Sequence, residues 1–109
     1  AAFDTPLNPG PLHPSGATLG AGGLLFLASA AAVREVALHL AGFNAAESCG
    51  KCTPCREGTP RAYEKLAGGD LGGLEELLEV ISVASLCGLG QMAPGPIRSA
   101  LHFWPELFA

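Results

Sequence analysis

The sequence predicts a small, mainly α-helical bundle, preceded by a Pro/Gly-rich segment and one short strand. The chain has 109 residues, of which 49% are hydrophobic and 15% charged, and this composition suits a single small core rather than a disordered chain. Apolar residues recur at helical spacing in several stretches. The 15 glycines and 9 prolines gather between those stretches, where they indicate irregular connections.

The Pro/Gly-rich segment occupies residues 1–23 and is expected to be a loop or linker, because its prolines lack the backbone N–H that helices and sheets need. The apolar run at residues 24–27 comes next. A short apolar run with Gly23 before it and Ser29 soon after it fits one buried strand. We therefore predict a strand at this point.

Two helices are predicted after the strand. Apolar spacing indicates the first over about residues 30–42, where Gly42 can end it. The second begins near residues 54–57 and stops at Gly68 and Gly69, so it is expected to be short.

Two more helices follow. The third is predicted over residues 72–84, and the fourth from about Ile97 until Pro105 disturbs it. Ala100, Leu101 and Trp104 would lie on the inner side of the fourth helix. The third helix has an apolar stripe formed by Leu74, Leu77, Leu78 and Ile81. Its opposite face is acidic and is expected to be solvated, with Glu75, Glu76 and Glu79.

Charge and hydropathy exclude two classes of partner. The formal net charge is −4 and no basic stripe is present, so no nucleic acid is expected to bind. The longest apolar stretch, residues 24–32, is far shorter than the roughly 20 residues that cross a bilayer, so no membrane span is expected. No export signal is visible, which favours a reducing, cytoplasmic compartment.

The four cysteines are the most informative residues. Cys49, Cys52 and Cys55 form a C-x2-C-x2-C triple, and Cys87 follows much later in the chain. A compact triple with one remote cysteine is typical of an iron–sulfur site, and it favours a [4Fe–4S] cluster with one thiolate on each iron. A four-cysteine zinc site is the main alternative, although such sites usually have two separated pairs. Disulfides fit a chain without an export signal poorly.

Residues between these cysteines can tune such a site. Gly50 lets the backbone approach inorganic sulfide, and Thr53 can contribute its amide and hydroxyl as hydrogen-bond donors to sulfur. Pro54 stiffens the loop. Lys51 and Arg56 would partly offset the negative charge of the thiolates.

Two runs of sequence around the cysteines, residues 47–59 and 85–94, closely resemble the C-terminal region of a known family. This family comprises the NADH-binding flavoprotein subunit of respiratory complex I and its soluble relatives. The resemblance implies a [4Fe–4S] cluster on Cys49, Cys52, Cys55 and Cys87 within a small helical bundle. It also implies that electrons reach the cluster from FMN that NADH has reduced.

Other parts of the chain refine this resemblance. The Cys-Gly-Leu-Gly-Gln-x-Ala-Pro run that begins at Cys87 is more similar to the soluble diaphorase-type subunits of NAD-linked formate dehydrogenases and hydrogenases. Residues 4–6 and 20–23 resemble the end of the β-grasp-type, soluble-ligand-binding domain that precedes the cluster domain in the family. The implied division is residues 1–28 for that end and linker, and residues 29–109 for the helical cluster domain.

The resemblance also implies what lies outside this chain. The glycine-rich FMN- and NADH-binding segments of the family are absent from the 109 residues, so FMN and NAD(H) are expected in the rest of the subunit or in a partner chain. The expected function is to relay single electrons between FMN and further iron–sulfur centres, without NADH oxidation by this chain alone. Expected partners are the flavin/NADH-binding portion, a [2Fe–2S] thioredoxin-like subunit and other iron–sulfur subunits, in the cytoplasm or at the periphery of the inner membrane.

The remaining polar and aromatic residues indicate no separate active site. The isolated His13, His39 and His102 are expected at the surface, and Phe103, Trp104 and Phe108 in the core or an interface. No acidic pair adjoins a nucleophile, so no catalytic residue is predicted. The alternative to electron transfer is a structural or interaction domain that a zinc ion holds together.

Overall fold

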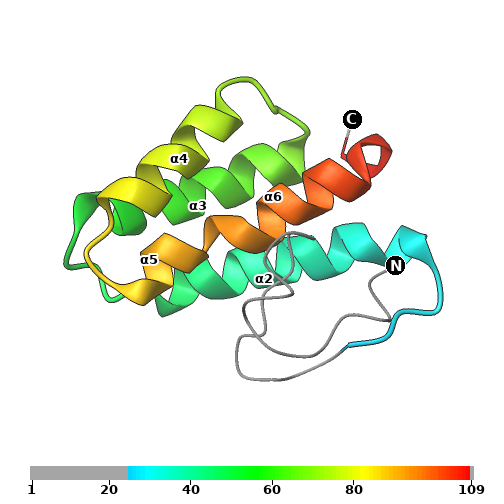
Figure 1. Ribbon diagram of the computed structural model, residues 1–109, viewed down its shortest axis with the longest axis horizontal. Coiled ribbons are helices and arrows are strands. Elements are labelled where there is room, and N and C mark those ends of the chain that lie inside the picture. Colours follow the sequence, from blue (N-terminus) through cyan, green and yellow to red (C-terminus); the bar gives the residue numbers. More distant parts are fainter. Residues whose placement is uncertain (1–24, 109) are drawn as a thin grey trace, which may run out of the picture.

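A computed structural model describes residues 25–108, which form a bundle of helices (Figure 1). The four longer helices alternate in direction, and α3 and α6 each contact both α2 and α4. This confirms the predicted mainly α, four-helix fold for the described residues. The elements are η3 (Ala30–Ala32), α2 (Val33–Glu47), α3 (Thr53–Gly68), α4 (Leu74–Ala84), α5 (Gly88–Met92), α6 (Pro94–Phe103) and η4 (Pro105–Leu107), where η is a 3-10 turn.

The predicted strand is wrong where it can be checked. Residues 25–27 have no regular structure, and residues 25–108 contain no strand with which they could pair. An unpaired strand would leave its backbone groups without ladder hydrogen bonds. Leu24 and the Pro/Gly-rich segment lie outside the described residues, so the division of the chain at residue 28 stays a prediction.

The first helix is longer than predicted. After the turn η3, α2 runs through Gly42 and ends only at Ser48, whose φ of −58° and ψ of 130° are not helical. Gly42 faces the ring of Tyr63 on α3, where an added Cβ would lie 3.4 Å from the nearest ring carbon. Packing between α2 and α3 therefore overrides the weak helix propensity of a single glycine.

The second helix has the predicted ends but is not short. It is α3, and its 16 residues make it the longest helix in the described part of the chain. Gly69 ends it with a φ of 72°, a left-handed conformation that glycine adopts at little cost. The Lys65 Nζ atom then bonds the Asp70 Oδ2 atom at 2.9 Å and the Gly72 carbonyl oxygen at 2.8 Å, which fixes the turn into α4.

The last part of the chain contains two helices where one was predicted. The short helix α5 lies between the third and fourth predicted helices, where no helix was predicted, and it contains Gly88 and Gly90. Helix α6 begins at Pro94, three residues before the predicted start at Ile97. Prolines are tolerated there because N–H groups in the first helical turn have no partner within the helix. Pro105 follows the end of α6, as predicted.

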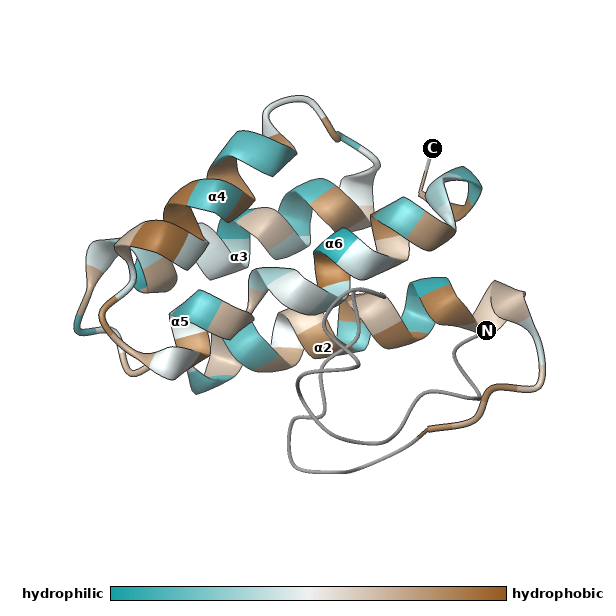
Figure 2. Cartoon of the chain, in the orientation of Figure 1, coloured by the Kyte–Doolittle hydropathy of each residue, from teal (hydrophilic) through white to brown (hydrophobic). Residues whose placement is uncertain are grey.

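The core lies between the inner faces of the four longer helices, and Figure 2 shows the alternation of apolar and polar residues along α4. The predicted stripe on α4 is confirmed, since Leu74, Leu78 and Ile81 are buried and Leu77 packs against them. The buried side chains of the core are Ala37, Ala41, Ala62, Leu66, Leu74, Leu78, Ile81, Ile97, Ala100 and Phe108.

The acidic face of α4 is exposed, but it is not only solvated. One Arg98 Nη atom on α6 lies 2.9 Å from a carboxylate oxygen of Glu75 and 2.8 Å from one of Glu79. Two residues one turn apart on α4 therefore hold one arginine of α6. Exposed pairs of this kind each stabilise a fold by less than about 1 kcal/mol.

None of the helices within residues 25–108 has the length and apolar character that a membrane crossing requires.

Candidate functional site

The four cysteines lie on, or directly after, two connections at one end of the bundle, the left end in Figure 1. The first connection, residues 48–52, joins α2 to α3, and Cys55 follows it in the first turn of α3. The second, residues 85–87, joins α4 to α5. Because the helices alternate in direction, two connections far apart in the sequence meet at the same end.

A close approach of α3 and α4 brings these connections together. A Cβ added to Gly58 would lie 2.6 Å from the Ile81 Cγ1 atom, so only a glycine allows this separation. Gly58 is about one turn after Cys55, and Ile81 is about one turn before Ser85. The contact therefore places Cys55 beside the start of the second connection.

A second glycine brings α5 against the same place. A Cβ added to Gly90 would lie 2.3 Å from the Ser85 Oγ atom and 3.1 Å from the Cys55 Cβ atom. Gly90 and Ser85 are both buried, as is Cys55, which is 4% exposed. Cys55 therefore packs directly against the segment that carries Cys87.

The thiol of Cys52 also faces this segment. The backbone N–H of Leu86 lowers the pKa of the Cys52 thiol below its usual value, and the N–H of Cys55 acts in the same direction. These donors stabilise the negative charge of a thiolate, which is the form that binds a metal. They come from both connections, so the two connections together prepare Cys52 as a ligand.

The first connection is held in shape by its own side chains. The φ of Gly50 is +79°, a left-handed conformation that glycine adopts at little cost. Arg56 donates from one Nη atom to the Gly50 carbonyl oxygen at 2.9 Å and from the other to the Thr53 Oγ1 atom at 3.3 Å. Ser48 accepts from the Gly50 N–H at 3.4 Å and from the Cys55 thiol at 3.2 Å. The Thr53 hydroxyl thus bonds Arg56 rather than a cysteine sulfur.

Helix ends add a favourable electrostatic environment. Cys52 is the N-cap residue of the 16-residue helix α3, and Cys87 is the N-cap residue of the short helix α5. The first N–H groups of a helix lack intrahelical partners, and together with the helix dipole they make its N-terminus partly positive. A thiolate at Cys52, at the N-terminus of the long helix α3, is stabilised for the same reason.

The sulfur atoms differ in exposure. Cys55 is buried and Cys52 half-buried, whereas Cys49 and Cys87 are exposed. In residues 25–108, no three His, Cys, Asp or Glu side chains gather as ligands of one metal ion. The contacts above join Cys52 and Cys55 to residues 85–90, and they leave Cys49 and Cys87 on the rim of the same end.

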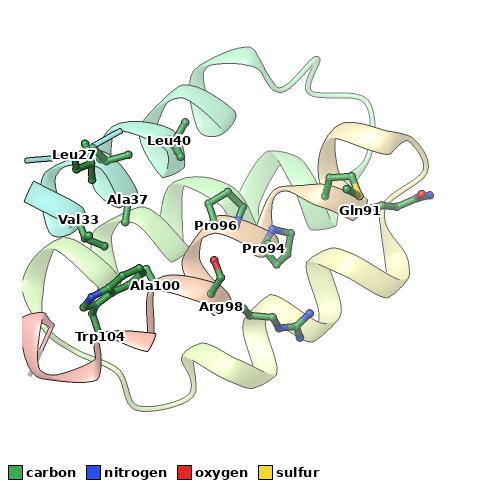
Figure 3. Close-up of a pocket in the computed structure, with 14 residues that line it drawn as sticks. Leu27, Val33, Ala37, Leu40, Gln91, Pro94, Pro96, Arg98, Ala100 and Trp104 are labelled. Carbon is green, nitrogen blue, oxygen red and sulfur yellow. The ribbon is translucent and has the colours of Figure 1, made fainter. Parts of the chain in front are cut away.

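A separate groove runs along α2 and α6 (Figure 3). Its volume is about 610 Å³, and its lining is mostly apolar and includes Val33, Leu40, Pro96 and Trp104. None of the four cysteines lines it. Trp104 therefore contributes to this groove, while Phe108 is buried in the core and Phe103 is exposed.

The isolated histidines were predicted to lie at the surface. His39 and His102 are exposed, as expected, while His13 lies outside the described residues. Sequence reasoning did not single out two serines near the cysteines: Ser48 accepts a hydrogen bond from the Cys55 thiol, and Ser85 lies beside Gly90, which also adjoins the Cys55 Cβ atom. Ser48 directly precedes Cys49, and Ser85 lies two residues before Cys87. Their position beside a ligand in the sequence is the signal that could have identified them.

Comparison with known proteins accounts for this arrangement. A sequence model of the family described as the "NADH-ubiquinone oxidoreductase-F iron-sulfur binding region" matches residues 35–109, which include all four cysteines. The chain belongs to this family. The resemblance inferred from the two cysteine runs is therefore confirmed, and so is the expectation of an iron–sulfur binding region.

Individual relatives agree with the family match. The NADP-reducing hydrogenase subunit HndC of Solidesulfovibrio fructosivorans is 40% identical over 91 residues, which cover 76% of this chain and 19% of the relative. An NADH-quinone oxidoreductase subunit of Rickettsia bellii is 36% identical over 105 residues, covering 88% of this chain and 25% of the relative. The protein of the same name in Mycobacterium tuberculosis is 35% identical over 116 residues, covering 98% of this chain and 26% of the relative.

The chain thus spans between 19% and 26% of the length of these curated relatives. One is a hydrogenase subunit and the others are subunits of quinone oxidoreductases. The part of this chain that matches the family model, residues 35–109, is described as an iron–sulfur binding region.

Proposed function

We propose that Cys49, Cys52, Cys55 and Cys87 bind one [4Fe–4S] cluster. The observation that carries this proposal is the packing of Cys55 and Cys52 against residues 85–90, which brings the compact triple and the remote cysteine to one end of the bundle. A cubane cluster takes one thiolate on each of four irons. Its cysteines therefore surround it and need not converge on one point.

The residues around the cysteines fit such a group. A four-thiolate cluster brings negative charge, and the N–H groups of Leu86 and Cys55 together with the N-terminus of α3 favour negative charge at Cys52. Gly50 and Gly90 keep side-chain bulk away from the site. The Ser85 hydroxyl is buried there without a partner in the described structure.

When bound, the cluster supplies a centre that accepts and releases one electron at a time. The residues of this chain fix its position and its potential. Ser48 and Arg56 hold the loop that carries Cys49 and Cys52, while the Gly58 contact holds Cys55 against the second connection. A rigid protein environment of this kind reduces the structural rearrangement around the cluster when its charge changes.

We further propose that the electrons pass between FMN and other iron–sulfur centres of a larger NAD(H)-dependent oxidoreductase. The length of the relatives supports this, because most of each relative lies outside the part matched here. The flavin- and NADH-binding portion and other iron–sulfur subunits would be the partners. The matched names include hydrogenase and quinone oxidoreductase subunits, and a role in formate oxidation stays a prediction.

A redox titration tests the relay. The protein is purified without exposure to air, reduced stepwise with dithionite and reoxidised, while electron paramagnetic resonance follows the reduced state. We expect one paramagnetic signal that appears with a one-electron dependence on potential and disappears on reoxidation. A protein without a reducible centre, as a zinc-bound domain would be, contradicts the proposal because zinc has no redox chemistry.

A further inference from the structure

Ser85 is the one buried side chain in the described structure whose polar atom has no hydrogen-bond partner. The residue is 5% exposed and caps the C-terminus of α4. Its backbone is fully paired, because its N–H donates to the Ile81 carbonyl oxygen at 3.3 Å and its own carbonyl oxygen accepts from the Gln91 Nε2 atom at 3.3 Å. Only the side-chain hydroxyl lacks a hydrogen-bond partner.

A buried hydroxyl without a partner is unfavourable by about 1–3 kcal/mol and is uncommon in folded proteins. Gly90 on one side leaves room for the hydroxyl, and the Cys55 Cβ atom adjoins the same glycine. The hydroxyl is therefore held between α5 and the cysteine triple.

Other hydroxyls near the cysteines already have partners. Ser48 accepts from the Gly50 N–H and the Cys55 thiol, and the Thr53 Oγ1 atom accepts from Arg56. Thr59 donates to the Cys55 carbonyl oxygen at 2.7 Å. Ser85 is thus the buried hydroxyl in this part of the described structure that makes no hydrogen bond.

We propose that the Ser85 hydroxyl donates a hydrogen bond to a sulfur atom of the bound cluster or its thiolates and thereby raises the reduction potential of the cluster. This inference rests on the proposed function, since it needs a bound cluster. Ser85 binds no iron itself, so it is a positioning residue rather than a ligand. The Cβ atom of the proposed ligand Cys55 and the Ser85 hydroxyl lie beside the same glycine, Gly90, which agrees with this placement.

The sign follows from charge. Reduction adds one negative charge, which spreads onto the cysteine sulfurs, and a hydrogen bond to a more negative acceptor is stronger. The donor therefore stabilises the reduced state more than the oxidised state. Removing the donor should lower the midpoint potential.

The experiment compares two substitutions on the same helix end. Ser85→Ala removes the buried hydroxyl, and Ser82→Ala makes the same chemical change one turn earlier, where the hydroxyl donates to the Gln91 carbonyl oxygen at 3.3 Å. Each variant and the unaltered protein are loaded with cluster, assayed for iron and sulfide, and titrated for the midpoint potential. We expect the ratio of reduced to oxidised cluster at a fixed potential to fall about tenfold in Ser85→Ala, which is a shift of about 59 mV for one electron.

Ser82→Ala should keep the potential of the unaltered protein. A Ser85→Ala protein that carries a full cluster at an unchanged potential would overturn the inference and leave the proposed function intact. If the unaltered protein itself holds no reducible cluster, the proposed function fails, and this inference fails with it.

A third variant decides the case in which Ser85→Ala does not take up iron. Ser85→Thr keeps the hydroxyl, so a full cluster at the original potential supports its role as a donor. Loss of iron in Ser85→Thr as well as in Ser85→Ala would overturn the inference, because it would show that serine is needed for its size.

Discussion

The two ends of the bundle are built in different ways. At the end where α3 passes into α4, large apolar side chains close the core, and Leu66, Leu74 and Phe108 are each at most 2% exposed. Polar groups there are paired, as when the Arg34 Nη2 atom donates to the Ala67 carbonyl oxygen at 3.0 Å. At the cysteine end, the buried positions are occupied by small residues such as Gly58, Ser85 and Gly90.

This difference indicates how the chain divides stability and function. The apolar end can be stabilised by the chain itself, because burial of hydrocarbon needs no further component. The cysteine end has thiols, helix N-termini and a hydroxyl without a partner, all of which suit an anionic group that is not protein. Substitutions at the apolar end should therefore lower the stability of the fold, whereas substitutions at the cysteine end should reduce cluster binding.

The largest expected effect is at the cysteine end. Cys55→Ala removes a proposed ligand that is also fixed by packing, and we expect the protein to lose most of the roughly four irons of a cubane cluster. Iron and sulfide analysis after anaerobic loading measures this, with Ser82→Ala as the matched control. A Cys55→Ala protein that retains the full iron content would break the assignment.

The next largest effect is a loss of stability that we expect at the apolar end and not at the cysteine end. Leu74→Ala opens a cavity in the core, and we expect it to lower the free energy of unfolding by about 2–5 kcal/mol. Leu86→Ala is the control at the cysteine end, since this side chain is 78% exposed and its loss should change stability by less than about 0.5 kcal/mol. Denaturant unfolding compares them, and similar losses in both variants would contradict the comparison.

A smaller effect concerns the close contact behind the site. In Gly58→Ala the new Cβ would meet the Ile81 side chain, and overpacking of this kind destabilises by about 1–3 kcal/mol. Gly68→Ala is the control, because Gly68 is also in α3 and an added Cβ there meets nothing within 4 Å. Thermal unfolding should show a loss in the first variant and no loss in the second. Equal melting temperatures would show that α3 and α4 are not held at this distance.

Much of the fold could be predicted from the sequence because its signals are local. The apolar stripe of α4 and the glycines that end α3 act through neighbouring residues, and both predictions are confirmed. The errors involve distant contacts. Gly42 does not end α2 because Tyr63 packs over it, and the apolar run at residues 25–27 has no strand beside it in the described part of the chain.

The candidate site was predictable in part for the same reason. The spacing of Cys49, Cys52 and Cys55 is a local pattern, and the family match that includes Cys87 agrees with it. The surroundings were not predictable, since the approach of Gly90 to Ser85 depends on how α5 packs. Arg56 lies beside the triple, as predicted, but its guanidinium bonds Gly50 and Thr53 within the loop.

The cysteine end of the bundle is proposed to hold an iron–sulfur cubane. The most direct test of this proposal is the content of iron, acid-labile sulfide and zinc in protein purified without exposure to air. The proposed site predicts about four irons and four sulfides per chain, with little zinc. One zinc per chain, with neither iron nor sulfide, would contradict it and would indicate a structural zinc site instead.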